Sequence, residues 1–311
     1  MADAEKITEY RVQSTDYGVQ GRALPLPASV ARERQLGPHA VPTLPEVGAI
    51  EAPDAEESRG WHRSVTSGVY DGAMAKPAHP LLVVFDMAGT TVHDNSDVAR
   101  CLTQALRTAG YYCDDALANT RMGMAKPVAI AELAALSLER GVGRAVTPSL
   151  VSEIHRDFLH AINEHYRTHP SVRAAEGAAE IFAALRHRGI KVALDTGFSR
   201  PTVDIILARL GWSVPATLDA VVTSDEVPHG RPAADLFLEA MRRCGVTDSR
   251  QCAHVGDTPS DIGEGRAAAV GWNIAIAGPS HTREQLDPLR PTHLVSALTA
   301  VPAALGLSLH T

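Results

Sequence analysis

Hydrophobic and polar positions divide the chain into regions of different character. Residues 1–78 combine many prolines and scattered charges with no sustained period of 2 or 3.6 residues. This pattern is typical of a largely disordered, Pro-rich arm. Residues 96–172 carry helical patterns only, whereas residues 79–95 and 173–311 alternate short apolar runs with helical stretches.

The first apolar run, LLVVF at 81–85, does not alternate with polar residues, which indicates a central strand covered on both faces. Further strands are predicted at 190–197, 219–225, 251–257 and 272–278, with a short one at 293–296. Helices are predicted between them at 177–189, 200–211, 232–245 and 260–271. Such alternation predicts a doubly wound, Rossmann-like α/β domain with a parallel sheet, formed by residues 79–95 and 173–311.

The helical block at 96–172 interrupts this domain directly after the first strand. Helices are predicted at 98–110, 126–141 and 149–169, the first of them with Asn95, Ser96 and Asp97 as candidate N-caps. We interpret the block as a cap domain inserted over the carboxyl edge of the sheet, where folds of this class bind their ligands.

Charge and composition narrow the classes of partner. The net charge is −7 and the hydrophobic fraction is 45%, so neither nucleic acid nor an anionic membrane surface is an expected partner. No stretch approaches the roughly 20 apolar residues of a membrane span. MADAEKITEY lacks a secretory signal pattern, which makes the cytoplasm the expected location. The oligomeric state is left open, with a homodimer as one option.

Polar residues follow two of the predicted strands in patterns that suit phosphoryl chemistry. In FDMAGTT, Asp86 ends the first strand, and Gly89 and Thr90 follow with free backbone N–H groups. A carboxylate in this position can attack phosphorus and form an aspartyl-phosphate. In ALDTGFS, Thr196 and the N–H of Gly197 can hydrogen-bond a phosphoryl oxygen.

Two later segments add charge. In VPHGRP, Arg231 lies in a stiff loop and can bind phosphoryl oxygens. In VGDTPSD, Asp257 and Asp261 suit a hard cation such as Mg²⁺, which takes few carboxylates. Each segment alone could be a set of helix caps. All four in this order on successive strands favour a catalytic site.

From about Leu81 to Leu305, these four motifs resemble those of the haloacid dehalogenase superfamily, hydrolases with an inserted cap. The resemblance implies that Asp86 is the nucleophile, Thr196 a phosphoryl ligand and Arg231 the motif-three cation. It also implies a Mg²⁺ ion held by Asp86, the Ala88 carbonyl and Asp257, with Asp261 in support.

The first motif departs from the common D-x-D pattern of phosphatases in this superfamily. Ala88 stands where the second Asp protonates the leaving group, and an alanine cannot transfer a proton. The phosphonatase branch, whose substrate is phosphonoacetaldehyde, also reads D-x-A-G-T. It carries M-G-x-x-K in its cap, similar to Met122, Gly123 and Lys126 here. The resemblance implies that Lys126 forms a Schiff base with an aldehyde, and only four of the 29 basic residues are lysines.

Other positions differ from that branch. Ala129 stands in place of a histidine three residues after the lysine, Ser96 in place of a cysteine, and Phe198 in place of a tyrosine. His93 and Asp94 could supply acid–base function, although a turn or cap role is the expected one.

Three functional hypotheses follow. The first is hydrolysis of the C–P bond of phosphonoacetaldehyde or a related phosphono-aldehyde. The second is a phosphomonoester phosphatase that acts on a small organic phosphate. The third is a catalytically silent binding protein, against which the intact Asp86, Thr196, Arg231 and Asp257 argue.

Overall fold

A computed structural model describes residues 79–308, which form a parallel sheet with helices on both faces. The predicted arm at 1–78 lies outside the described residues. The sheet has six strands in the order β3-β2-β1-β4-β5-β6, all neighbours being parallel. The strands are β1 (Leu82–Phe85), β2 (Lys191–Thr196), β3 (Ala220–Thr223), β4 (Cys252–Gly256), β5 (Trp272–Ile276) and β6 (His293–Val295).

Helices follow the strands as the alternating pattern predicts. The helices after the insertion are α6 (Ala178–His187), α7 (Arg200–Leu210), α8 (Asp235–Cys244), α9 (Pro259–Ala267), α10 (Arg283–Leu286) and α11 (Val301–Ala304). Short 3-10 turns lie at Ser224–Glu226, Ser249–Gln251, Asp287–Leu289 and Leu298–Ala300. The predicted α/β class with a parallel, Rossmann-like sheet is confirmed.

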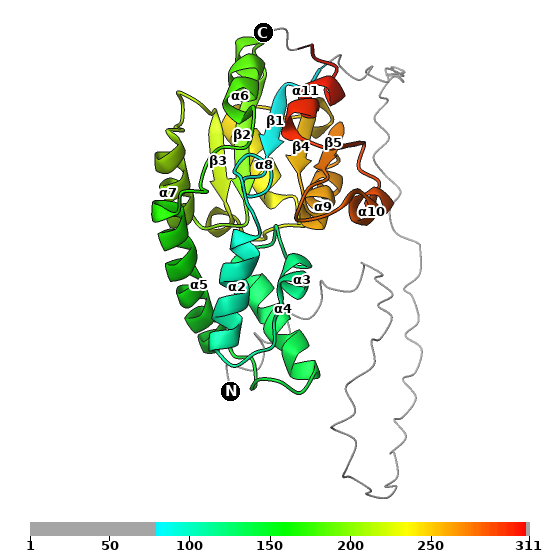
Figure 1. Cartoon of the computed structure of the whole chain (residues 1–311). Helices are drawn as coiled ribbons and strands as arrows, with labels where there is room; N and C mark the ends of the chain where they lie inside the picture. Colours follow the sequence, from blue (N-terminus) through cyan, green and yellow to red (C-terminus); the bar gives the residue numbers. More distant parts are fainter. Residues whose placement is uncertain (1–78, 309–311) are drawn as a thin grey trace, which may run out of the picture. The chain divides into compact units, whose positions relative to one another are not determined.

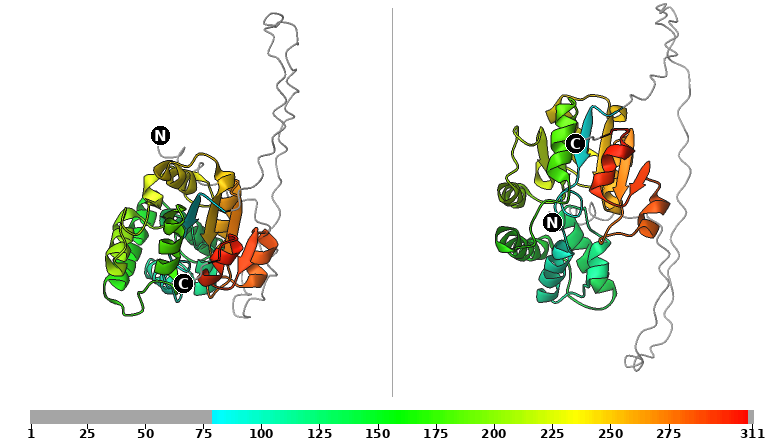
Figure 2. Two further views of the ribbon diagram at one scale, coloured as in Figure 1. Left: turned by 90° about the horizontal axis from the view of Figure 1, so that it is seen from above. Right: turned by 45° about the horizontal axis from the view of Figure 1, so that its top comes forward.

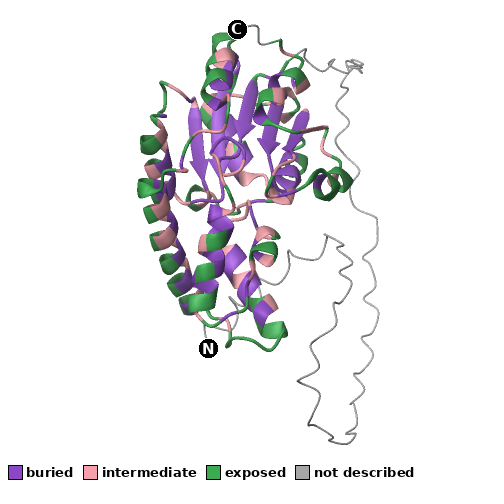
Figure 3. Ribbon diagram, viewed as in Figure 1, coloured by how far each residue is buried: buried purple, intermediate pink, exposed green. Residues whose placement is uncertain are grey.

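Burial of both sheet faces explains why the first strand is apolar at every position. Phe85 packs on Phe182 of α6 with ring centroids 5.5 Å apart. Val84, which points to the opposite face, belongs to a second buried cluster with Phe237 of α8. The strands are buried along most of their lengths (Figure 3). A strand in which apolar and polar residues alternate would place polar side chains against one of these two apolar clusters.

The segment between β1 and α6 contains helices only. These are α2 (Asp97–Thr108), α3 (Asp115–Asn119), α4 (Lys126–Glu139) and α5 (Pro148–Thr168). Helix α5 buries Ile154, Phe158, Ile162 and Tyr166, which are four residues apart and therefore share one face. In Figures 1 and 2 the arrowheads of the strands point toward α2, α3 and α4. We call α2–α5 the cap helices.

Of the candidate N-caps, Ser96 is the N-cap residue of α2, but it has φ 60° and its side chain makes no capping hydrogen bond. Instead, the Asp94 carboxylate accepts from the backbone N–H groups of Asp97 and Val98, at 2.9 and 3.3 Å. The cap role expected for Asp94 is thereby confirmed: its side chain caps the N-terminus of α2, the first cap helix.

None of the helices within residues 79–308 is long and apolar enough to cross a bilayer.

Candidate active site

The predicted functional side chains meet at the carboxyl edge of the sheet, around β1. The chain runs outward from β1 to β2 and β3 on one side and to β4, β5 and β6 on the other, so the strand order reverses here. Asp86 directly follows β1, and its backbone N–H donates to the Val255 carbonyl of β4 at 2.9 Å. Thr196 ends β2, and Asp257 directly follows β4. All three side chains are buried.

Three carboxylates form a group that could hold a cation. Asp86, Asp257 and Asp261 are buried, and one oxygen of each lies within 4.8 Å of the others. Burial raises the pKa of Asp86 to about 7, with Asp261 adding to the rise and Arg231 opposing it. Burial and the charges of Asp86 and Asp261 also raise the pKa of Asp257 well above its usual range. The donor set is oxygen-rich and short of positive charge, so these residues fit a hard cation.

Asp261 serves the helix as well as this group. Its Oδ2 accepts from the backbone N–H and the hydroxyl of Thr258, at 2.8 and 2.6 Å, in a capping box at the start of α9. Its Oδ1 lies 2.8 Å from Nη1 of Arg231, as an ion pair without hydrogen-bond geometry. The capping and site interpretations of this residue are therefore compatible.

The loop between Asp86 and α2 lies against Asp257. The Thr90 hydroxyl donates to Oδ1 of Asp257 at 3.1 Å. Gly89 has φ 95°, and a Cβ at this position would collide with the Asp257 carboxylate. Glycine is thus required here for both backbone conformation and space. Ala88 is half-buried in the same loop, and its main chain forms an isolated bridge with Val92.

Arg231 is buried and points toward the nucleophile position. Its Nη1 donates to Oδ1 of Asp86 at 2.5 Å. Its remaining N–H groups contact Asp195 and Glu264, which the sequence motifs did not include. These carboxylates raise its pKa well above the usual range despite burial, so the guanidinium is charged.

The loop Met122–Ala125, which we call the cap loop, joins α3 to α4 and lies directly on the sheet edge. The Ser260 hydroxyl donates to the Met122 carbonyl at 3.0 Å. A Cβ on Gly197 would come within 2.5 Å of the Met124 carbonyl oxygen, and one on Gly230 within 3.1 Å of Ala125. Glycines on two core loops therefore allow the close approach of the cap loop, which at Gly197 is backbone to backbone.

Lys126 begins α4 and is buried, with 4% of its surface exposed. Its Nζ donates to the Met124 carbonyl at 3.2 Å and lies over the Phe198 ring, 5.2 Å from the centroid. Burial lowers its pKa to about 8, and Asp86 is the strongest of the charges that oppose the shift. The structure thus gathers an amine with a low pKa and the predicted nucleophile into one buried region.

Reasoning from motifs missed Asp195, His254 and Glu264, which surround Arg231. The available signal was their polarity in apolar surroundings: Asp195 precedes Thr196, and His254 stands inside the buried strand β4. Glu264 lies one turn after Asp261 on α9.

Comparison with known proteins agrees with this geometry. The profile of the haloacid dehalogenase-like hydrolases matches residues 81–269, and the chain belongs to this family. It is therefore an enzyme of the hydrolase class rather than a silent binding protein.

Its curated relatives include phosphonoacetaldehyde hydrolases. The enzyme of Bacillus cereus strain ZK / E33L is 30% identical over 234 residues, which cover 70% of this chain and 85% of the relative. That of Bacillus cereus strain AH187 is 31% identical over 205 residues, 62% of this chain and 74% of the relative. The predicted membership of the phosphonatase-like branch is confirmed.

Solved structures support the fold. A phosphonoacetaldehyde hydrolase-like protein from Oleispira antarctica superimposes with a TM-score of 0.62 at 20% identity, over 74% of this chain and 92% of that one. A protein from Haemophilus somnus, predicted to be a phosphoglycolate phosphatase, gives 0.58 at 18% identity, over 72% and 96%.

Proposed function

We propose that this hydrolase cleaves the C–P bond of phosphonoacetaldehyde or a closely related phosphono-aldehyde. The observation that carries the proposal is Lys126: a buried amine, over the Phe198 ring, whose pKa is lowered to about 8. An amine with this pKa is partly neutral near pH 7, as attack on an aldehyde requires. The phosphonoacetaldehyde hydrolase relatives support the same substrate class.

The reaction begins at Lys126. Its neutral Nζ attacks the aldehyde carbon, and uptake of one proton with loss of water leaves an iminium that links the lysine to the phosphonate. This iminium is an electron sink two bonds from phosphorus. Because the electron pair of the C–P bond can move into it, the carbon leaving group needs no proton at the moment of cleavage. The alanine at position 88 is consistent with such a reaction.

Asp86 supplies the nucleophile. One carboxylate oxygen attacks phosphorus as the C–P bond breaks, which gives an aspartyl-phosphate and an enamine on Lys126. Protonation of the enamine carbon and hydrolysis of the resulting imine release acetaldehyde and the free amine. Water then hydrolyses the aspartyl-phosphate to inorganic phosphate.

The remaining residues orient the phosphoryl group and balance its charge. Arg231 already contacts Asp86, so its guanidinium can bind phosphoryl oxygens beside the nucleophile. Thr196 and the N–H of Gly197 lie at the end of β2 and would donate to the same group. We assign a Mg²⁺ ion to Asp86, Asp257, Asp261 and the Ala88 carbonyl. When bound, it supplies positive charge that offsets the repulsion between carboxylate and phosphonate.

Borohydride trapping tests the proposal. The protein is incubated with phosphonoacetaldehyde, reduced, digested and mapped by mass spectrometry. We expect one stable adduct on Lys126, absent from Lys126→Ala. Lys191, which is exposed and ion-paired to Asp219, is the internal control and should remain unmodified. An unmodified Lys126 in a protein that still releases phosphate from phosphonoacetaldehyde would rule out the Schiff base.

The second candidate is a phosphomonoester phosphatase, the function predicted for the Haemophilus somnus neighbour. Ala88→Asp separates the two functions, because it restores the acid that an ester leaving group needs. If this is a phosphonatase, Ala88→Asp should raise turnover of a small phosphate ester above that of the unaltered protein and leave C–P cleavage no faster. Ester turnover by the unaltered protein that survives Lys126→Ala would favour the phosphatase instead.

A further inference from the structure

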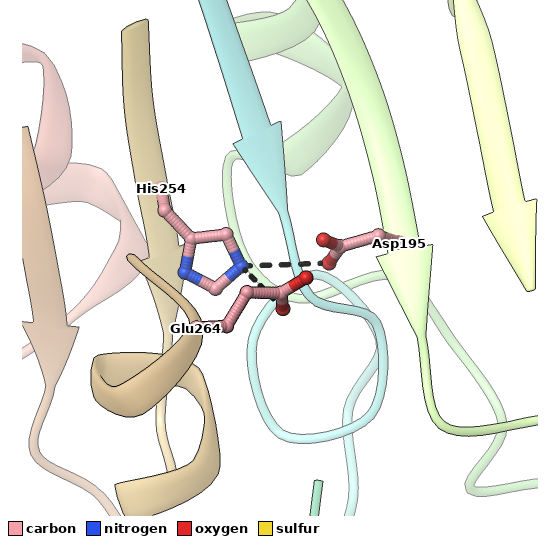
Figure 4. A group of neighbouring side chains, drawn as sticks. All are labelled: Asp195, His254 and Glu264. Carbon is pink, nitrogen blue, oxygen red and sulfur yellow. Dashed lines mark ion pairs between the residues drawn. The ribbon is translucent and has the colours of Figure 1, made fainter. Parts of the chain in front are cut away.

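A buried cluster of titratable side chains lies behind Arg231 and takes no part in the proposed reaction. It consists of Asp195 from β2, His254 from β4 and Glu264 from α9, each with 0% of its surface exposed. Figure 4 shows one ring nitrogen of His254 facing both carboxylates. This Nε2 lies 3.5 Å from Oδ1 of Asp195 and 3.4 Å from Oε2 of Glu264.

The same two oxygens also contact Arg231. Nη2 of Arg231 pairs with Oδ1 of Asp195, and Nε donates to Oε2 of Glu264 at 2.6 Å. Arg231, Asp195, His254 and Glu264 therefore form a closed ring in which potential positive and negative groups alternate. We call it the charge ring. Only Nη1 of Arg231 leaves the ring, toward Asp86 and Asp261.

The ring needs a second positive charge. One guanidinium is shared by four buried carboxylates: two in the ring and two at the nucleophile. Leaving one of them uncompensated in the interior is costly. Burial alone lowers the pKa of His254, but Asp195 and Glu264 outweigh it and raise the pKa to about 10. A protonated His254 is thus the counter-charge that the inner carboxylates lack.

We infer that His254 is a positioning residue: its imidazolium balances Asp195 and Glu264, so that the outer face of the Arg231 guanidinium remains available to the phosphoryl group. Without that charge, the inner carboxylates would draw Arg231 inward and compete with the substrate. The inference rests on the phosphoryl-binding role proposed for Arg231. By this inference, a fully buried residue that does not touch the substrate contributes to the affinity for phosphate.

A metal ion is the competing interpretation of this cluster. Asp195, His254 and Glu264 offer ligand atoms within 4.8 Å of one another. However, Arg231 already contacts the two carboxylate oxygens that face His254. A dication would have to displace Arg231 from both of these oxygens, whereas at the Mg²⁺ site Asp257 makes no ion pair with Arg231. The ring is complete without a metal.

Inorganic phosphate binding tests the inference independently of turnover. Its dissociation constant is measured by titration calorimetry with Mg²⁺ for the unaltered protein, His254→Gln and His254→Lys. His254→Gln retains an N–H donor but loses the charge, and should weaken phosphate binding by about tenfold, equivalent to roughly 1.4 kcal/mol. His254→Lys keeps the charge and should bind within a few-fold of the unaltered protein. Cys252→Ala, a buried change on the same strand without contact to Arg231, controls for core damage.

A double variant separates charge from shape. His254→Gln combined with Glu264→Gln leaves Arg231 and Asp195 as a balanced pair. It should bind phosphate more tightly than His254→Gln alone, a coupling that a purely steric role would not produce. If His254→Gln does not fold, the phosphate affinities of the double variant and of His254→Lys test the role of the His254 charge instead.

Three outcomes would overturn the inference. One is unchanged phosphate affinity in His254→Gln with a loss of thermal stability like that of Cys252→Ala. Another is tenfold weaker binding in His254→Lys. The third is one equivalent of tightly bound transition metal, detected by elemental analysis and lost in His254→Gln. Absence of phosphate binding by the unaltered protein would instead contradict the proposed function and, with it, the role of Arg231.

Discussion

Nζ of Lys126 lies over the face of the Phe198 ring, 5.2 Å from its centroid, so an aromatic side chain from a core loop contacts the amine of a cap helix. The ring stabilises the charged form of the lysine by about 0.5–2 kcal/mol. The structure therefore combines a ring contact that favours the ammonium with burial that disfavours it. Burial lowers the pKa of Lys126 to about 8, and the charge of Asp86 opposes the shift.

Borohydride trapping at Lys126 should depend on pH through this balance. Because the neutral amine is the nucleophile, the initial rate should rise with pH and be half-maximal near pH 8. Phe198→Leu removes the ring face and should lower the midpoint by up to about one pH unit. Phe198→Tyr keeps the ring and is the matched control. A midpoint near pH 10 in the unaltered protein would contradict the burial argument.

Lys126→Met should stabilise the protein near neutral pH. The folded-state pKa of about 8 lies below the unfolded value of about 10.4. The protonated lysine therefore reduces stability below pH 8, and this cost disappears as the pH rises through about 10.4. We expect the variant to be more stable by about 1–3 kcal/mol at pH 7, with the difference shrinking between pH 8 and 10.5. Urea unfolding at several pH values measures it, and a less stable variant at pH 7 would refute the prediction.

Magnesium should raise the unfolding temperature without any substrate present. Burial raises the pKa of both Asp86 and Asp257, and neighbouring carboxylates add to both shifts. A cation that binds only the folded state stabilises it in proportion to the logarithm of its concentration. A thermal shift series in MgCl₂ should show this rise, and Asp257→Asn should lose most of it. Equal shifts with NaCl at matched ionic strength would point to screening instead.

Gly197→Ala should impair activity through the cap loop. The added Cβ would lie within 2.5 Å of the Met124 carbonyl oxygen and 2.7 Å of that of Gly123, both backbone atoms that cannot rotate away. We expect kcat/KM to fall by at least about tenfold, since small displacements of a site are costly. Gly278→Ala is the matched control, because its Cβ would meet nothing within 4 Å. Steady-state kinetics compares the two variants. Equal activities would show that the cap loop can move away from the added Cβ without loss of function.

Much of this fold is legible in the sequence because strong local patterns coincide with its elements. The run that ends at Phe85 and the residues Val192–Leu194 of β2 are buried on both faces, and their apolar composition follows directly from that. Helix α3 has five residues, and α10 and α11 have four each, too short for a periodic pattern to develop. Their positions depend on packing, which local periodicity does not report.

The site divides in a similar way. Asp86, Thr196 and Asp257 are recognisable because each directly follows or ends a strand, and parallel strands bring such ends together. The charge ring was not recognisable, because Asp195, His254 and Glu264 are ordinary polar residues until the strand order brings them to Arg231. Their partnership depends on β1 lying between β2 and β4, and this neighbour relationship has no signature in any single segment.

The cap loop, Met122–Ala125, packs closely on the sheet edge, and this contact limits how cap helices can be exchanged between related enzymes. This loop belongs to the inserted segment by sequence, yet it packs closely on the loops that carry Gly197 and Gly230 and on Ser260 at the start of α9. A chimera that takes its cap helices from a relative would inherit a loop fitted to another surface. The functional exchange unit is therefore the cap helices without this loop, and the junctions of a working chimera should lie within the helices on either side of it.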